Sequence, residues 1–383
     1  MPYAQGRTYY DSDSHIMETV DWLHGHVDAD KTDVIHPLNP KNAGTMALEA
    51  IAAAEQRRAD ADATAKLLEK PLISGPKGWG AFGASTPDER SKALDLLGFD
   101  QQLVFPTFSL GQFARSPDED TVYAGASALN RGMASFCAGD RRMRAVGFVP
   151  LRNPERAVAC LDEALKDGIS AVWVPSDPPG DFSPAHVDLH PVWARLQEAK
   201  VPVVLHIGGG KLLPRPYHNN GLPKPTDFLG GGENLRGKDY PALCHSPQNF
   251  LTSMVLDGVF QKFEGLQCGV IELGATWVPT FMRMLDQAAH AFKRMEPTLR
   301  GLDLKPSEYI QRQVKFSLFP YEDVGWLIEQ AGPELFMFAS DYPHPEGGRD
   351  PIGSFEKRLD AADIGEPARD RFYEKNFAEL MAL

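Results

Sequence analysis

Carboxylate and histidine side chains follow several short apolar runs of the sequence, and these residue types can bind a metal ion. The first run leads into Asp11-Ser12-Asp13-Ser14-His15. Side chains alternate along a β-strand, so Asp13 and His15 project from the same face. Carboxylate oxygens and imidazole nitrogens are ligands for divalent metals such as zinc and manganese. The pair therefore predicts half of a metal site.

Three later runs end in similar residues. VPVVLH ends in His206, CGVIE ends in Glu272, and LFMFAS is followed by Asp341, with His344 a little further on. Taken singly, each residue also fits a structural role as a cap or a hydrogen-bonded core residue. A carboxylate at the end of an apolar strand is costly unless it is paired or coordinated. The recurrence at four separate run ends predicts a metal-dependent enzyme, with Glu272, Asp341 and His344 as catalytic candidates.

The elements that would position these residues are short strands that alternate with helical patterns. The eight predicted strands cover residues 8–16, 102–106, 143–150, 169–175, 201–206, 268–273, 314–318 and 335–340. Several are almost continuously hydrophobic, which is typical of parallel strands buried on both faces. Eight strand–helix units predict an α/β fold, a (β/α)8 TIM barrel, whose enzymes carry their chemistry at the C-terminal ends of the strands.

Two long segments exceed what a minimal barrel needs. They cover about residues 17–98, after the first strand, and 207–246, after the fifth. The length of 383 residues also allows two domains, but the eight strands favour a single barrel domain over residues 1–383. Both insertions follow a strand's C-terminal end, so we expect them to overhang the active site. His218 and His245, which flank the Gly-rich part of the second insertion, and Trp277 are candidate substrate-binding residues.

The composition narrows the classes of partner. A chain with 43% hydrophobic and 24% charged residues is globular, and its net charge of −13 disfavours nucleic acid and anionic membranes as partners. No apolar run is long enough to span a membrane, and the first residues do not resemble a secretion signal. Four widely separated cysteines predict free thiols. We expect a cytoplasmic enzyme that acts on a small molecule.

Five segments of the sequence resemble the amidohydrolase superfamily, specifically the amidohydrolase-related group that includes aminocarboxymuconate semialdehyde decarboxylase and the resorcylate-type decarboxylases. They are DSDSHIME, VPVVLHIGG, GVIELGATWVP followed by RMLD, SDYPHPEG and KNFAEL. The resemblance implies one divalent metal ion, Zn or Mn, held by Asp13, His15, His206 and Asp341. It also implies a homo-oligomer, in the first instance a dimer, with the 17–98 insertion as a plausible interface element.

Two positions depart from the common pattern of this group. Asp13 stands where many members have a histidine, although a carboxylate occurs there in the aromatic-acid decarboxylases. Glu272 stands where many relatives have a histidine that contacts the metal-bound water. Glu272 could be a ligand, a general base or a proton donor, and the base role is our first hypothesis.

Two reactions fit such a site. In hydrolysis the metal activates a water and a carboxylate takes its proton, whereas in non-oxidative decarboxylation an acid protonates the carbon that loses CO₂. Asp13 and Asp341 would neutralise the metal, and Glu272 would leave a charge of about −1, with no Lys or Arg at the strand ends. We therefore rank a hydrolase of a small cyclic or aromatic ester, lactone, amide or C–C bond first. A decarboxylase of an aromatic or muconate-type acid is the alternative, and a non-catalytic binding barrel is third.

Overall fold

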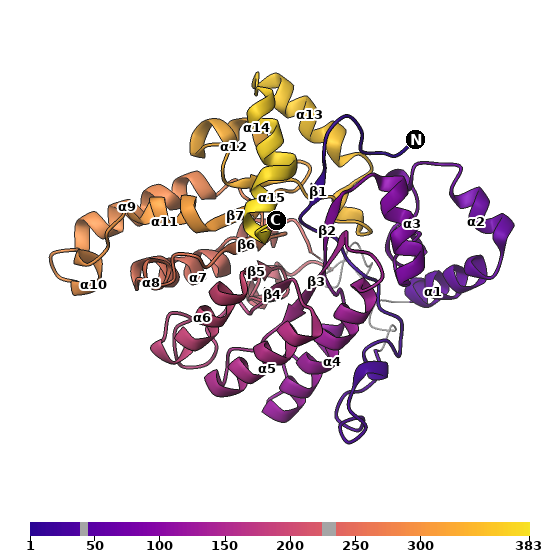
Figure 1. The fold of residues 1–383 in the computed structure, drawn as a ribbon, viewed down its shortest axis with the longest axis horizontal. Helices are drawn as coiled ribbons and strands as arrows, with labels where there is room; N and C mark the ends of the chain where they lie inside the picture. Colours follow the sequence, from indigo (N-terminus) through magenta and orange to yellow (C-terminus); the bar gives the residue numbers. More distant parts are fainter. Residues whose placement is uncertain (39–44, 224–234) are drawn as a thin grey trace.

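A parallel sheet of eight strands forms the centre of the molecule, and helices surround it (Figure 1). The computed structural model describes residues 1–38, 45–223 and 235–383. The strands are β1 (Tyr10–Asp11), β2 (Gln101–Val104), β3 (Met143–Phe148), β4 (Ala171–Trp173), β5 (Val203–His206), β6 (Cys268–Ile271), β7 (Val314–Ser317) and β8 (Phe336–Met337). Each strand pairs in parallel with the next along the chain. The predicted (β/α)8 barrel is confirmed.

Helices connect the strands and surround the sheet (Figure 1). They are α1 (Thr45–Arg58), α2 (Ala61–Leu67), α3 (Pro87–Leu97), α4 (Glu119–Cys137), α5 (Pro154–Asp167), α6 (His190–Ala199), α7 (His245–Leu256), α8 (Val259–Lys262), α9 (Val278–Phe292), α10 (Pro297–Arg300), α11 (Pro306–Gln313), α12 (Val324–Ala331), α13 (Pro351–Ala361), α14 (Glu366–Asp370) and α15 (Asn376–Met381). In α5 the Asn153 side chain accepts a hydrogen bond from the Arg156 N–H, and Gly168 ends the helix at φ 96°.

The first and last strands are shorter than predicted. At the mouth of the barrel, isolated backbone hydrogen bonds join the segments that follow these two strands. Beyond β1 and β8, Ser14 forms an isolated parallel bridge with Tyr342. The Asp341 N–H donates to the Asp13 carbonyl at 2.9 Å, and the His15 N–H donates to the Tyr342 carbonyl at 2.8 Å. The segments that carry the predicted metal ligands therefore lie side by side, although they are far apart in the sequence.

Two connections are longer than the rest. The connection from β1 to β2 contains α1, α2 and α3, which lie together on one side of the barrel in Figure 1. The connection from β5 to α7 contains short 3₁₀ turns, including Arg215–His218. Residues 39–44 of the first insertion and 224–234 of the second lie outside the described residues. The C-terminal helix α15 covers the sheet at the centre of Figure 1 and contacts β1, β7 and β8.

Two further predictions concern the whole chain. All four cysteines are free thiols, as predicted. Within the part of the chain that the structure describes, every helix is too short or too polar to cross a lipid bilayer.

Candidate metal centre

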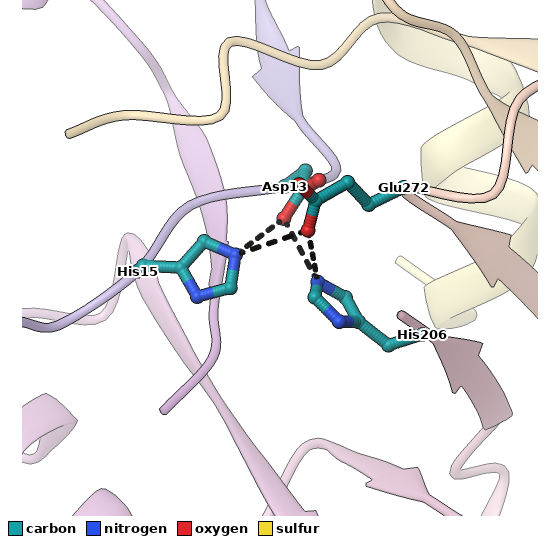
Figure 2. Close-up of side chains that lie close together, drawn as sticks. All are labelled: Asp13, His15, His206 and Glu272. Atoms are coloured by element: carbon teal, nitrogen blue, oxygen red, sulfur yellow. Dashed lines mark ion pairs between the residues drawn. The ribbon is translucent and has the colours of Figure 1, made fainter. Parts of the chain in front are cut away.

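Four ligand-type side chains from three strand ends converge on one point (Figure 2). Asp13 and His15 follow β1, His206 is the last residue of β5, and Glu272 directly follows β6. The Asp13 Oδ1 atom lies 3.3 Å from His15 Nε2 and 3.5 Å from His206 Nε2. The Glu272 Oε2 atom lies 3.3 Å from His206 Nε2 and 3.8 Å from His15 Nε2. All four residues are at most 6% exposed.

A second group overlaps the first and adds the segment after β8. It contains His15, Glu272, Asp341 and His344, all buried. The Asp341 Oδ1 atom lies 3.7 Å from His15 Nε2 and 3.0 Å from His344 Nδ1. The His344 ring stacks on the His15 ring with 4.0 Å between centroids. The structure thus places all six residues that the sequence predicted for the metal and for catalysis in two overlapping groups, which share His15 and Glu272.

The two histidines of the first group are oriented as metal ligands are. His15 Nδ1 lies 3.2 Å from the Pro106 carbonyl, and His206 Nδ1 lies 2.9 Å from the Ile207 carbonyl. A carbonyl only accepts, so Nδ1 carries the hydrogen and the Nε2 lone pair faces the cluster. Metal-binding histidines in proteins are held in this way by a partner of their second nitrogen.

The donor atoms fit one divalent metal ion. Asp13 Oδ1, His15 Nε2 and His206 Nε2 are buried and make no hydrogen bond to any residue that the structure describes. Lone pairs that face one another without a proton or cation between them repel, and buried polar atoms without partners are costly. Ligands about 2.1 Å from a shared tetrahedral ion lie about 3.4 Å apart, close to the separations found here. Nitrogen with carboxylate oxygen suits zinc or manganese.

Burial and neighbouring charges set the protonation of these groups. Burial and the neighbouring His344 lower the pKa of His15 to about 3, so its ring is neutral. Burial raises the pKa of Asp341 to about 7, despite the opposing effect of His344. His15 is therefore in the neutral form that binds metal.

A buried polar network beneath the donors fixes the seam between β1 and β8. Asp11 accepts hydrogen bonds from Ser340 N–H at 2.8 Å, Ser340 Oγ at 2.6 Å and Gln102 Nε2 at 2.7 Å. Arg90 of α3, fully buried, donates to Gln102 Oε1 at 3.0 Å, to the Gly83 carbonyl at 2.7 Å and to the His15 carbonyl. The network joins the residue before Asp341 to the segment that carries His15. Neither Arg90 nor Gln102 stood out in the sequence.

The His344 ring is held by the loop after β2. Its Nε2 atom lies 3.0 Å from Thr107 Oγ1, whose own hydrogen goes to the Ile16 carbonyl at 2.7 Å. The Thr107 hydroxyl therefore accepts from His344 Nε2, which leaves Nδ1 toward Asp341. The buried Glu18 carboxylate accepts from the backbone N–H groups of Thr107, Phe108 and Ser109 and fixes this loop. Sequence analysis did not identify Thr107 or Glu18, which carry no local motif.

Besides Arg90, a second cation, Lys77, contacts the segment that follows β8, and it was not predicted. The Lys77 Nζ atom is buried and has no hydrogen-bond partner among the described residues. It lies 5.7 Å from the centroid of the Tyr342 ring, next to Asp341 in the chain, and the following Gly78 N–H donates to the Pro343 carbonyl at 2.8 Å. Burial lowers the pKa of Lys77 to about 8, while the Asp341 and Glu346 carboxylates act in the opposite direction. Lys77 is therefore mostly charged at neutral pH.

The three predicted substrate-binding residues, His218, His245 and Trp277, lie outside the metal-ligand groups found in the described part of the chain, and their role in substrate binding stays a prediction. His218 Nε2 lies 3.0 Å from Asp239 Oδ1, and His245 is exposed at the start of α7. The Trp277 indole N–H donates to the Leu273 and Gly274 carbonyls at 3.2 and 2.9 Å.

Comparison with protein families agrees with the fold and the donor set. A family model described as Amidohydrolase matches residues 11–381. The chain therefore belongs to the amidohydrolase family, as its motifs predicted. It is an enzyme of the metal-dependent hydrolase and carboxy-lyase class. No curated protein matches the chain.

Solved structures share the fold over nearly the whole chain. An amidohydrolase from Mycobacterium avium subsp. paratuberculosis is 22% identical, with a TM-score of 0.73 and 99% of each chain covered. A 5-carboxyvanillate decarboxylase from Novosphingobium aromaticivorans, solved with manganese and a nitrobenzoic acid, is 16% identical, with a TM-score of 0.64 and 100% and 99% of the chains covered. A 2,6-dihydroxybenzoate decarboxylase from Rhizobium is 16% identical, with a TM-score of 0.60 and 98% and 99% covered.

Proposed function

We propose that Asp13, His15, His206 and Asp341 hold one divalent ion, Zn²⁺ or Mn²⁺, and that Glu272 and His344 transfer protons beside it. The buried donor atoms without hydrogen bonds and the fixed Nδ1 atoms of both histidines support this assignment. A metal ion bound there would supply a Lewis acid that polarises a substrate oxygen. Glu272 lies within the donor group and carries a second carboxylate oxygen for proton transfer.

We infer that the substrate is a small aromatic or unsaturated carboxylic acid and that the reaction is loss of CO₂. The observation that carries this choice is the buried Lys77 ammonium next to the Asp341 segment. The carboxylates of Asp13, Glu272 and Asp341 with a divalent ion leave a charge of about −1, which Lys77 offsets. Without Lys77 the site would repel an anion, and this was the reason to rank hydrolysis first from the sequence. Two similar structures are decarboxylases of aromatic acids, which agrees with this proposal.

The residues on the β8 side supply the proton that this reaction needs. When the bond to the carboxylate breaks, CO₂ leaves and the electron pair stays on the substrate carbon, which must then take a proton. Asp341 binds the metal as a carboxylate, and the His344 Nδ1 atom lies 3.0 Å from its Oδ1 atom, so His344 is the residue that carries the proton to the substrate carbon. Lys77 holds the anionic end of the substrate.

Hydrolysis is the second candidate, and the position of Glu272 favours it. Its Oε2 atom faces His206 Nε2 at 3.3 Å, inside the donor group, where a carboxylate can take a proton from an attacking water. The substrate would then be a small neutral cyclic or aromatic ester, lactone or amide, or a compound with a C–C bond that water can cleave.

One experiment separates these reactions. The protein loaded with Mn²⁺ or Zn²⁺ is incubated with hydroxybenzoic and muconate-type acids and with matched neutral lactones and esters. Release of CO₂ from an acid is the expected result. Acid release from neutral substrates without CO₂ would establish hydrolysis instead. If metal analysis finds no divalent ion bound, both reactions are refuted, and a non-catalytic barrel that binds a ligand is the remaining interpretation.

We also propose a homo-oligomer, of which the dimer is the simplest form. Met284 and Phe292 of α9 and Met295 beyond its end are large apolar side chains that are 57%, 48% and 69% exposed. The predicted interface in the 17–98 insertion is the second candidate surface. Sedimentation of the protein and of a Phe292→Ser variant measures the mass, and a monomer at all concentrations contradicts the proposal.

A further inference from the structure

The turn that follows β6 carries Glu272 in an unusual backbone conformation. Glu272 has φ 54° and Gly274 has φ 65°, so two residues within this turn lie in the left-handed region. The turn leads directly into α9, and the backbone N–H groups of Ala275 and Thr276 precede the helix. Buried N–H groups outside a helix need acceptors from elsewhere in the protein. The location of Glu272 therefore depends on whatever holds this turn.

The buried carboxylate of Glu322, in the connection that follows β7, holds this turn. Glu322 Oε1 accepts from Ala275 N–H at 2.8 Å, from Thr276 N–H at 2.8 Å and from Thr276 Oγ1 at 2.7 Å. The other oxygen of Glu322 accepts from Phe319 N–H at 2.9 Å. Glu322 is 4% exposed, so solvent competes little for these bonds. A carboxylate that accepts several N–H groups forms stronger bonds than a neutral acceptor.

The backbone of Glu272 itself is bound by the adjacent strand. Its N–H donates to Ser317 Oγ at 2.9 Å, and Ser317 is the last residue of β7. The metal-ligand groups in the described residues contain no residue of β7 or of the connection that follows it. This part of the barrel contacts the turn after β6 instead.

We propose that Glu322 and Ser317 are positioning residues for Glu272. They hold its backbone and the turn beyond it, and so keep the Glu272 Oε2 atom at the donor cluster, 3.3 Å from His206 Nε2. This inference rests on the proposed role of Glu272 at the metal site. Groups that orient metal-site residues through hydrogen bonds affect metal affinity about 10- to 100-fold.

The test uses Co²⁺, whose visible spectrum reports coordination without any substrate. We expect Glu322→Gln to shift the spectrum of the Co²⁺-loaded protein and to weaken Co²⁺ binding about 10-fold. The matched control is Asp286→Asn, because Asp286 of α9 accepts from Ser307 N–H and Oγ at 2.9 and 2.8 Å and joins α9 to α11, outside the donor cluster. The control should keep the wild-type spectrum. Ser317→Ala, a milder change, should shift the spectrum in the same direction.

A double variant separates positioning from a general loss of structure. In a Glu272→Gln protein, adding Glu322→Gln should change the spectrum and the affinity no further. Two results would overturn the inference and leave the proposed function in place. The first is that Glu322→Gln weakens Co²⁺ binding as much in the Glu272→Gln protein as in the wild type. The second is that Glu322→Gln, like Asp286→Asn, keeps the wild-type spectrum and affinity. A wild-type protein that binds no Co²⁺, Mn²⁺ or Zn²⁺ overturns both.

Discussion

Glu272 and Asp341, the carboxylates that follow β6 and β8, both adopt left-handed backbone conformations, with φ angles of 54° and 49°. This region costs a residue other than glycine roughly 1 kcal/mol or more. The other such residues among those described, Lys200, Asp363 and Ala382, lie at or just beyond the C-terminal ends of helices, where the conformation is common. Backbone strain at the centre of the barrel is thus found at two residues proposed for chemistry.

Replacing Asp341 by asparagine should stabilise the metal-free protein while removing its metal. We expect the free energy of unfolding at pH 8 to rise by about 1–2 kcal/mol, because a buried charge is lost and asparagine tolerates positive φ. The folded carboxyl has a pKa of about 7, far above its unfolded value, so the cost of its charge is absent below about pH 4 and complete above pH 7. The stabilisation should therefore be larger at pH 8 than at pH 5.

Urea unfolding in the presence of EDTA measures this effect, and metal analysis should show divalent binding weakened at least about 100-fold. Asp118→Asn is the control, since Asp118 caps α4 at the surface and asparagine caps equally well. A less stable Asp341→Asn protein would contradict the prediction.

Lys77→Met should raise the KM for a carboxylic acid substrate about 10- to 100-fold and change kcat less, because the ammonium binds the anion in both the ground state and the transition state. Lys77→Arg should keep most of the affinity. Since the pKa of Lys77 is about 8, the wild-type KM should rise above pH 8, and the arginine variant should lack that rise. Steady-state kinetics against pH measures this. Lys357→Met, at an exposed position of α13, is the control. An unchanged KM in Lys77→Met would remove the argument for an acid substrate.

Thr107→Val should lower kcat about 10-fold and leave KM within about twofold, because the His344 ring loses the acceptor that orients it. Valine has nearly the same shape, so the packing of the loop is retained. Thr107→Ser keeps the hydroxyl and should restore activity. If the valine and serine variants have equal kcat, the hydroxyl has no part in orienting His344.

Arg90→Met should destabilise the protein by about 3–5 kcal/mol, because the Gly83 and His15 carbonyls and Gln102 Oε1 all lose a buried donor. Chemical denaturation measures the change. Arg195→Met is the comparison, since its ion pairs with Asp162 and Glu198 are largely exposed and should matter by less than about 1 kcal/mol. Similar losses in the two variants would show that the network around Arg90 does not hold the seam.

The candidate donors can be proposed from the sequence because their signal is local. His206 and Glu272 stand directly after apolar runs, and Asp13 and His15 have the spacing of one strand face. The residues that support the donors through hydrogen bonds have no such local signal. Glu322 has no feature in the sequence that separates it from a surface charge, and its role depends on two connections meeting in space. The predicted ranges of β1 and β8 were also too long. The segments beyond these strands are joined by isolated bridges and side-chain hydrogen bonds rather than by a regular β-ladder.

Lys77 shows how such an omission affects a functional conclusion. The charge of the site, counted from the strand ends alone, favoured a neutral substrate. Lys77 lies in a Gly- and Pro-rich stretch of the first insertion, where no periodic pattern places a side chain. Its contact with the Tyr342 ring comes only from the folded chain.

The seam between β1 and β8 has a consequence for how the enzyme is made. Asp13 and His15 come from the start of the chain, whereas Asp341 and His344 come from near its end, and the two segments bind each other directly. A chain still growing on the ribosome holds the first pair long before the second exists. A chain cut before residue 341 would therefore retain all eight strands and still lack Asp341 and His344, so the proposed metal site would be complete only in a chain that extends beyond residue 344.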